Sequence, residues 1–171
     1  LLYAQLRHGK ERKMSANSNG LKIIIVGAGK VGETLTAQLI KEKHDITVID
    51  QSSEAISRIT GMYDVMGVIG NGASYNVQME AGIENTDLLI AVTDSDELNL
   101  LTCTVARQVA GCSAIARVRT PDYNSEADYL RDKLGLAMII NPELEAAREA
   151  ARILYLPTAL EVGSFAHGQS E

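Results

Sequence analysis

The chain has 171 residues and a formal net charge of −6, a length that allows one sizeable hydrophobic core and a small appendage but not two full domains. The first 20 residues carry a net charge of +3 and the other 151 therefore carry −9. Because a surface that binds phosphate backbones must be basic, a DNA or RNA partner is not expected. No apolar run approaches the roughly 18 residues of a membrane span, and Cys103 and Cys112 lack the spacing of a zinc site, which favours two buried thiols in a reducing cytoplasm over a disulfide.

Residues 1–20 do not match the alternation of strands and helices that follows them. Their last part, Ser15 to Gly20 (SANSNG), has the composition of a linker, and a doubly wound domain starts naturally with the strand expected from Leu21. We interpret residues 1–20 as a tag or flexible arm. The alternative is that Leu1 to Lys13 forms a helix that docks elsewhere.

The stretch from Leu21 to Asp50 has the pattern of one strand–helix–strand unit. An apolar, largely β-branched run, Leu21 then Ile23 to Val26, predicts a strand that is buried on both faces. After a cluster of glycines, apolar residues recur at helical spacing as far as Lys43, and a second β-branched run over 46–49 predicts a strand that ends on Asp50.

The spacing of the three glycines predicts a phosphate-binding loop. Gly27 permits a tight turn, Gly29 lets the backbone approach a diphosphate, and Gly32 lets the helix pack near the strand. The helix then directs its free N–H groups and the positive end of its dipole at the phosphates. Asp50 lies eighteen residues beyond Gly32, where it can accept hydrogen bonds from both ribose hydroxyls of an adenosine and would repel a 2′-phosphate. The alternative is a glycine turn that only allows close packing.

A third strand and a second glycine turn are expected next. Ser52 or Ser53 can cap a short helix, and residues 65–69 are expected to form the strand. That strand runs into Gly70–Ser74, a turn at the carboxyl end of a strand, where open α/β sheets bind ligands. Asn71 either hydrogen-bonds an adenine edge or a ribose, or forms an Asx turn that opens the next helix.

The second half repeats the alternation without a glycine fingerprint. Strands are expected over 88–92, 114–118 and 136–140, and helices after Ser95 and over 122–133. Ser95 is the expected N-cap of the first of these helices, whose core face we assign to Leu98, Leu101, Val105 and Val109. Together the elements predict an α/β fold, a Rossmann-like doubly wound parallel sheet of about six strands over residues 21–141.

A long helix is expected from Pro142, where proline at the first helical position is well tolerated, to about Tyr155. Its apolar residues lie on more than one side, and its small residues permit close approach of another helix, which indicates a dimer partner. We expect residues 142–171 to comprise this dimerisation helix and the start of a truncated C-terminal segment, with a strand at 162–166.

Six motifs of the chain form a specific set. They are GAGKVG at 27–32, Asp50, Gly70–Gly72, AGIENTDLLIAVTDSDELNLL at 81–101, ARVRTPDY at 116–123 and NPE at 141–143. Together they resemble the N-terminal nucleotide-binding domain of the TrkA family, the cytoplasmic regulatory subunits of Trk/Ktr potassium uptake systems, which are related to the RCK domains of potassium channels. The resemblance covers about residues 21–166. Family members usually continue into a further regulatory domain or repeat, so the chain is expected to be a fragment.

The resemblance implies a Rossmann-like domain that binds NAD(H), or in some members ATP or ADP. It also implies a homo-oligomer, a dimer or a ring, and a membrane partner, the potassium-translocating subunit. The domain would gate that partner from the cytoplasmic face of the membrane without inserting into it. The residues leave NAD(H) and ATP/ADP both open, because both ligands present the same adenosine ribose to Asp50.

The candidate cofactor-binding residues follow from the match to the family by position. They are Gly27, Ala28, Gly29, Lys30, Val31 and Gly32 in the phosphate loop; Asp50 and Gln51 at the ribose; Asn71, Gly72 and Ala73 at the adenosine; Thr93, Asp94 and Glu97 on the far side; and Arg117 at a phosphate or an inter-subunit contact. Lys30 either meets a terminal phosphate or is a solvated lysine in a first helical turn. The exposed acids Asp94, Asp96 and Glu97 either bind a divalent cation or complement the helix dipole; we favour the second interpretation and expect no metal.

The resemblance therefore predicts a ligand-sensing regulatory module and not an enzyme. A dehydrogenase needs a substrate domain and an acid/base group beside the nicotinamide, whereas the nucleotide fold uses up this chain. In the alternative, a small NAD-dependent oxidoreductase, Tyr75, Tyr123 or Cys103 would have to be the acid, and none has a lysine or histidine at a suitable spacing. A third hypothesis, an ADP-sensing scaffold unconnected to potassium, shares every feature of the first.

Overall fold

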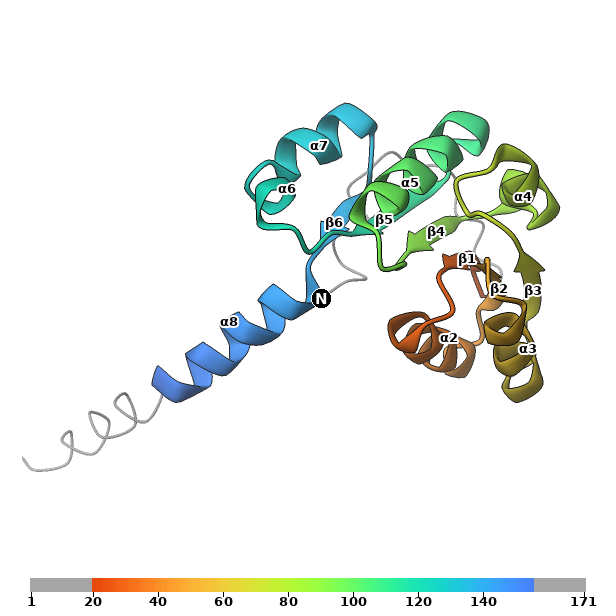
Figure 1. Ribbon diagram of the computed structural model, residues 1–171, viewed down its shortest axis with the longest axis horizontal. Coiled ribbons are helices and arrows are strands. Elements are labelled where there is room, and N and C mark those ends of the chain that lie inside the picture. Colours follow the sequence, from red (N-terminus) through yellow and green to blue (C-terminus); the bar gives the residue numbers. More distant parts are fainter. Residues whose placement is uncertain (1–19, 156–171) are drawn as a thin grey trace, which may run out of the picture. The chain divides into compact units, whose positions relative to one another are not determined.

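The computed structural model describes residues 20–155, whose helices and strands are drawn in Figure 1. Contacts divide the chain into two units, one that ends at Ile140 and one that begins at Asn141. The expected arm before residue 20, the strand expected at 162–166 and the C-terminal segment after residue 155 lie outside the described residues. No helix within 20–155 combines the length and the apolar character needed to cross a membrane.

The first unit is a six-stranded, all-parallel sheet with helices on both faces. Its strands are β1 (Lys22–Val26), β2 (Asp45–Asp50), β3 (Met66–Ile69), β4 (Leu88–Ala91), β5 (Ser113–Arg117) and β6 (Met138–Ile140), in the spatial order β3-β2-β1-β4-β5-β6. Its helices are α2 (Lys30–Lys41), α3 (Ser53–Met62), α4 (Tyr75–Glu80), α5 (Asp96–Ala110), α6 (Pro121–Ser125) and α7 (Ala127–Leu134), with a 3₁₀ turn, η2 (Ile83–Asn85). The predicted Rossmann-like, doubly wound sheet is confirmed.

Two hydrophobic cores cover the two faces of the sheet, and β1 contributes to both because successive side chains of a strand point in opposite directions. Ile24 and Val26 pack in the core beneath α4, η2 and α5, whereas Ile23 and Ile25 pack in the core beneath α2 and α3. In Figure 1, α2 and α3 accordingly lie on one side of the sheet and α4, α5 and α7 on the other. Burial on both faces explains why the central strands are unbroken apolar runs.

Serine caps fix the starts of the helices that follow β2 and β4, as predicted. The Ser52 hydroxyl accepts a hydrogen bond from the Ala55 N–H, and the Ser95 hydroxyl accepts one from the Leu98 N–H, both at 3.1 Å. Because Ser52 lies two residues beyond β2 and Ser95 lies four residues beyond β4, α3 and α5 begin close to the carboxyl edge of the sheet.

The core face that we predicted for α5 is wrong at Leu101, whereas Val109 packs against the core as predicted. Leu101 is 54% exposed, whereas Asn99, Cys103 and Ala106 are fully buried. Asn99 finds hydrogen-bond partners inside the protein, so a polar residue occupies a core position that an apolar pattern cannot indicate.

The single helix expected over residues 122–133 is two helices, α6 and α7. Glu126 between them leaves helical geometry, with φ −108° and ψ 11°. The change of direction lets Leu130 and Leu134 pack against the core. No glycine or proline marks this break, and glutamate favours helices, so local composition gave no signal.

The described part of the second unit is α8 (Pro142–Tyr155), which begins at the predicted proline. Ion pairs at i,i+3 spacing join Arg148 to Glu145 at 2.9 Å and Arg152 to Glu149 at 3.0 Å, and each contributes a few tenths of a kcal/mol to such a helix. Its role in dimerisation stays a prediction.

Candidate functional site

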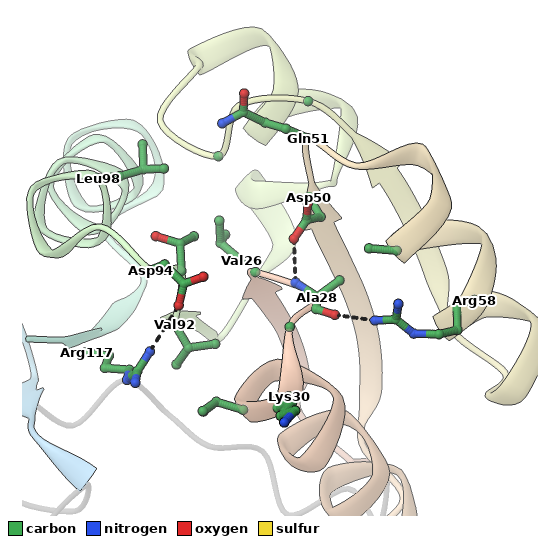
Figure 2. A pocket seen from close by; sticks show the side chains of 17 residues that line it. Val26, Ala28, Lys30, Asp50, Gln51, Arg58, Val92, Asp94, Leu98 and Arg117 are labelled. Carbon is green, nitrogen blue, oxygen red and sulfur yellow. Dashed lines mark hydrogen bonds and ion pairs between the residues drawn. The ribbon is translucent and has the colours of Figure 1, made fainter. Parts of the chain in front are cut away.

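A cavity of about 600 Å³ lies at the carboxyl ends of β1 and β4, where the strand order reverses. The helix that follows β1 packs on one face of the sheet and the helix that follows β4 packs on the other, so a crevice opens between the two loops. Seventeen residues line it, and Figure 2 draws their side chains. The volume is typical of small-molecule and cofactor sites, which span about 300–1,000 Å³.

The glycine loop between β1 and α2 forms one wall of the cavity. Gly27 has φ +107°, in the region that favours glycine. A Cβ on Gly32 would lie 1.8 Å from the Gly27 carbonyl oxygen, so the close approach of α2 requires that glycine. A Cβ on Gly29 would meet no atom within 4 Å. The fold therefore requires Gly27 and Gly32, and only an approaching ligand would require Gly29.

The N-terminus of α2 opens into this cavity. Gly29 is its N-cap residue, and no side chain of residues 20–155 caps it. Gly29, Lys30 and Val31 all line the cavity, so the free N–H groups and the positive end of the helix dipole are available to an anion. Lys30 adds a cation at the first helical position.

Asp50, at the end of β2, holds the same loop. Its Oδ2 accepts a hydrogen bond from the Ala28 N–H at 2.7 Å, and its Oδ1 accepts one from the Ser52 N–H at 2.8 Å. Each carboxylate oxygen has more than one lone pair, and Asp50 lines the cavity. It can therefore accept further bonds from vicinal hydroxyls, such as those of a ribose, while it fixes the loop.

Arg58 of α3 also contacts this loop, and sequence reasoning missed it. Its Nη2 donates to the Ala28 carbonyl oxygen at 3.0 Å, and its Nε lies 3.6 Å from Glu33 Oε2. Ala28 is thus held at its N–H by Asp50 and at its carbonyl by Arg58 (Figure 2). Helical spacing could have indicated Arg58. It lies three residues after Ala55, which also lines the cavity, and so on the same face of the helix that begins just after Asp50.

The second glycine turn contributes backbone to the cavity and not the Asn71 side chain. Gly70 and Gly72 line the cavity, whereas Asn71 Oδ1 accepts a hydrogen bond from the Ala73 N–H at 2.9 Å. This is the Asx turn that was one of the two alternatives for Asn71, and it occupies the side-chain oxygen locally.

The far side of the cavity carries both signs of charge. Thr93, Asp94, Leu98 and Arg117 line it. The Arg117 side chain is only 7% exposed, and its Nη1 lies 3.9 Å from Oδ1 of the fully exposed Asp94 (Figure 2). A buried guanidinium therefore lies beside a solvated carboxylate on this side of the cavity.

Asp96 does not line this cavity, and our expectation that it is exposed is wrong. It is 5% exposed, and its Oδ2 accepts hydrogen bonds from the N–H groups of Arg119 and Thr120 and from the Thr120 hydroxyl, at 2.6–2.9 Å. Burial opposes ionisation of this carboxyl, but those hydrogen bonds and the Arg119 charge outweigh burial and lower the pKa of Asp96. Asp96 therefore fastens the chain beyond β5 to the first turn of α5.

Glu97 likewise stabilises the start of α5. Its Oε2 accepts a hydrogen bond from the Ser95 hydroxyl at 3.0 Å, and its Oε1 accepts one from the Tyr123 hydroxyl at 3.3 Å. Hydrogen bonds from its own N–H and from Ser95 lower the pKa of Glu97. Within residues 20–155, no three His, Cys, Asp or Glu side chains lie close enough together to hold a metal ion.

The structure brings most of the predicted site residues to one cavity. Eleven of them line it: Gly27, Ala28, Gly29, Lys30, Val31, Asp50, Gln51, Gly72, Thr93, Asp94 and Arg117. Four do not: Gly32, Asn71, Ala73 and Glu97. Six lining residues were not predicted: Val26, Ala55, Arg58, Gly70, Val92 and Leu98. Val26 and Val92 lie at strand ends beside predicted residues, a position that could have indicated them.

None of the three residues considered as the acid of an oxidoreductase lines this cavity: Tyr75, Tyr123 or Cys103. The described residues that line the cavity include no tyrosine, histidine or cysteine. Cys103 is fully buried, and burial raises the pKa of its thiol to about 12. The Tyr123 hydroxyl donates to Glu97, whose charge raises the pKa of Tyr123. Cys103 and Cys112 are free, buried thiols, as predicted.

Comparison with known proteins gives a family and a set of relatives. The family model for the TrkA-N domain matches residues 23–142. The chain is 36% identical over 151 residues to the Trk system potassium uptake protein TrkA homolog of Archaeoglobus fulgidus, which covers 88% of this chain and 34% of that protein. It is 36% identical over 152 residues to the Trk system potassium uptake protein TrkA of Haemophilus influenzae, with 87% and 33% covered. The chain thus spans about a third of the length of the curated relatives that it matches.

Solved structures share the fold. The TrkA-N domain of inner membrane protein ybaL from Escherichia coli superposes with a TM-score of 0.70 at 24% identity, over 81% of this chain and 99% of that one. The GsuK channel bound to NAD gives 0.61 at 20% identity, over 81% and 24%. The AMP-bound Kef C-terminal domain of Shewanella denitrificans gives 0.63 at 21% identity, over 78% and 82%.

Proposed function

The chain belongs to the TrkA-N domain family, and from this premise we propose that it is the nucleotide-sensing module of a regulatory subunit that gates a membrane potassium transporter. The curated relatives are named as potassium uptake proteins, and they match the chain over 85–88% of its length. The subunit works in the cytoplasm, at the inner face of the membrane, through a membrane-embedded potassium-translocating partner. It senses its ligand and does not transform it.

One observation carries the binding part of the proposal: Asp50 holds Ala28 of a loop whose next residue, Gly29, is open to the cavity. A pyrophosphate at the N-terminus of α2 would meet free N–H groups and a helix dipole. The attached ribose would then lie beside the Asp50 carboxylate, which has lone pairs to spare. This arrangement fits an adenosine diphosphate moiety, which NAD(H), ADP and ATP share.

We propose NAD(H) as the preferred ligand, with ATP or ADP as competitors. Asp94 presents an exposed carboxylate on the far side of the cavity, where it would accept hydrogen bonds from the second ribose of a dinucleotide and would repel a terminal phosphate. Lys30 and Arg117 oppose that repulsion, so phosphate-rich ligands are weakened and not excluded. Neighbours of the same fold have been solved with NAD and with AMP.

The proposed mechanism is linkage between ligand binding and assembly. A nucleotide that binds one arrangement of the subunits more tightly than another shifts the population by at most its differential affinity. We propose that residues 142–155 form the dimerisation helix of a homodimer or ring, and that closure around the ligand passes through this helix to the membrane partner.

Calorimetric titration with NADH, NAD⁺, ATP and ADP tests the binding step. The proposal expects one site per chain, tightest for NADH or NAD⁺, and weakened by Asp50→Ala. Absence of binding by all four ligands would refute it. The gating step is tested in the full-length subunit, reconstituted with its translocating partner in vesicles: NADH should change the potassium flux, and the Asp50→Ala subunit should not respond.

A further inference from the structure

Asn99 is a buried polar residue that does not touch the cavity and yet holds its far side. It lies in the first turn of α5 and is 0% exposed. Its side-chain amide makes four hydrogen bonds: Oδ1 accepts from the Thr93 N–H at 2.9 Å and from the Thr93 hydroxyl at 2.7 Å, and Nδ2 donates to the carbonyls of Thr93 at 3.1 Å and Arg117 at 2.9 Å. An amide has two acceptor lone pairs and two donor hydrogens, so its capacity is fully used.

These bonds join two strands just beyond the point where their own pairing ends. The ladder between β4 and β5 runs from Leu88 and Ser113 to Ala91 and Ala116. Past its last rung, the carbonyls of Thr93 and Arg117 both need a donor, because buried carbonyls without a partner are costly. The Asn99 amide supplies one N–H to each carbonyl and so continues the connection through a side chain.

The two segments that Asn99 joins both contribute to the far side of the cavity. Thr93 and Arg117 both line the cavity. The near side, by contrast, is held by Asp50 and Arg58 through their bonds to Ala28. The side chains that hold the far side and the near side are therefore different.

We propose that Asn99 is a positioning residue for the second nucleoside of a dinucleotide ligand, and that it has no part in binding the adenosine monophosphate half. The inference rests on the proposed function, because it takes the cavity to bind an adenine nucleotide. Groups that recognise a ligand must be held within a fraction of an ångström by a supporting layer of packed, hydrogen-bonded side chains. Without Asn99, the backbone groups of Thr93 and the carbonyl of Arg117 would lose their hydrogen-bond partners, and the Arg117 guanidinium would no longer be held in one position.

The test compares two ligands on Asn99→Ala: NADH, which spans both sides of the cavity, and AMP, which occupies the near side alone. The dissociation constant for NADH should rise by about tenfold or more, the effect of losing one or more well-placed hydrogen bonds. The constant for AMP should stay within about twofold. The ratio of the two constants is the readout, because any unfolded fraction of the variant weakens both ligands equally.

A matched control separates positioning from general damage to α5. Cys103→Ala removes another fully buried side chain one turn further along the same helix, whose thiol bonds the Ile115 carbonyl and no cavity residue. This variant should lower the stability and leave the ratio unchanged. If Asn99→Ala does not fold, Asn99→Ser replaces it, because a neutral serine hydroxyl has a single donor hydrogen and can satisfy at most one of the two carbonyls; its ratio should rise as well.

The outcomes are distinct. A ratio that rises for the Asn99 variant and not for Cys103→Ala supports the inference. An equal loss of NADH and AMP, or an unchanged ratio, overturns the inference and leaves the proposed function intact. A wild-type chain that binds neither NADH nor AMP overturns the proposed function and the inference with it.

Discussion

The Ala28 N–H donates a 2.7 Å hydrogen bond to Asp50 Oδ2, so the acid at the tip of β2 holds the glycine loop that follows β1. The same carboxylate accepts the Ser52 N–H through its other oxygen and so also fixes the start of α3. Asp50 is therefore both a structural brace and the group best placed to accept a sugar hydroxyl, and a test of its role must separate the two contributions.

Asp50→Ala should lose about 1.5–3 kcal/mol of affinity for AMP, the range for hydrogen bonds to a charged group, which is roughly 10- to 150-fold in the dissociation constant. Titration with 2′-deoxy-AMP separates the ribose contact from the brace. The wild-type chain should bind the deoxy ligand more weakly than AMP, and Asp50→Ala should bind the two alike. Equal binding of both ligands by the wild type would contradict the ribose assignment.

Gly29→Ala and Gly32→Ala should affect different properties: the first should lower nucleotide affinity and the second should lower the stability of the fold. Gly29 has φ −73° and open space at its Cβ position, so Gly29→Ala should shift the unfolding free energy by only about 1 kcal/mol and reduce nucleotide affinity, because the methyl group stands where a diphosphate would lie. Gly32→Ala would place a methyl 1.8 Å from the Gly27 carbonyl oxygen and should destabilise the fold by about 1–3 kcal/mol or more.

Urea unfolding and calorimetry on the two glycine variants check this pair. A Gly29→Ala variant that binds nucleotide like the wild type would show that the loop backbone does not approach the ligand. A Gly32→Ala variant as stable as the wild type would show that the helix does not need its close approach.

Asp96→Asn should lower the free energy of unfolding by about 1–3 kcal/mol at neutral pH, the usual effect of weakening hydrogen bonds to a buried charge. Hydrogen bonds from Thr120 and Arg119 overcome the effect of burial and lower the pKa of Asp96 in the folded state. The stability from this carboxylate is therefore fully present above its ordinary value of 3.8 and is lost as the pH falls through the lower folded pKa.

The measurement is urea unfolding of wild type and Asp96→Asn from pH 7 down to the acid limit of the fold. The gap between the two proteins should close as the pH falls below 3.8. Glu84→Gln, which removes an exposed carboxylate from η2, should show no comparable gap at any pH. A gap that widens in acid would contradict this, because it would mean that folding raises the pKa of Asp96.

Both cysteines should resist a thiol reagent in the native protein. Cys103 is 0% and Cys112 is 4% exposed, and burial raises the pKa of both thiols, that of Cys103 to about 12, so little reactive thiolate exists at pH 8. Ellman's reagent should label neither thiol promptly in buffer and both in denaturant. Rapid labelling of either one in the native state would contradict the packing of α5 against β5.

Much of the fold was predictable because its strands are buried on both faces. Unbroken β-branched runs such as 23–26 and 46–49 can lie only in the middle of such a sheet, and the caps Ser52 and Ser95 fixed where the next helices begin. The glycine spacing and Asp50 indicated the near side of the cavity, because the role of each depends on the local geometry of the loop.

The features that could not be predicted depend on tertiary contacts. Asn99 occupies a core position because its hydrogen-bond partners, Thr93 and Arg117, lie at the ends of β4 and β5. No local sequence pattern indicates these distant partners. Arg58 reaches the Ala28 carbonyl across thirty residues of sequence. The break at Glu126 follows from packing of α7 against the core and not from a helix-breaking residue.

The binding of a nucleotide at the N-terminus of α2 is tested most directly by a titration of the ¹⁵N-labelled chain with NADH. Amide resonances of Gly29, Lys30, Val31 and Thr93 should show the largest shifts, and those of β6 (Met138–Ile140), on the far edge of the sheet, should show little change. If the amides of residues 29–31 stay unmoved up to about 1 mM ligand, where even a weak site of about −4 kcal/mol is half filled, the cavity is not a nucleotide site.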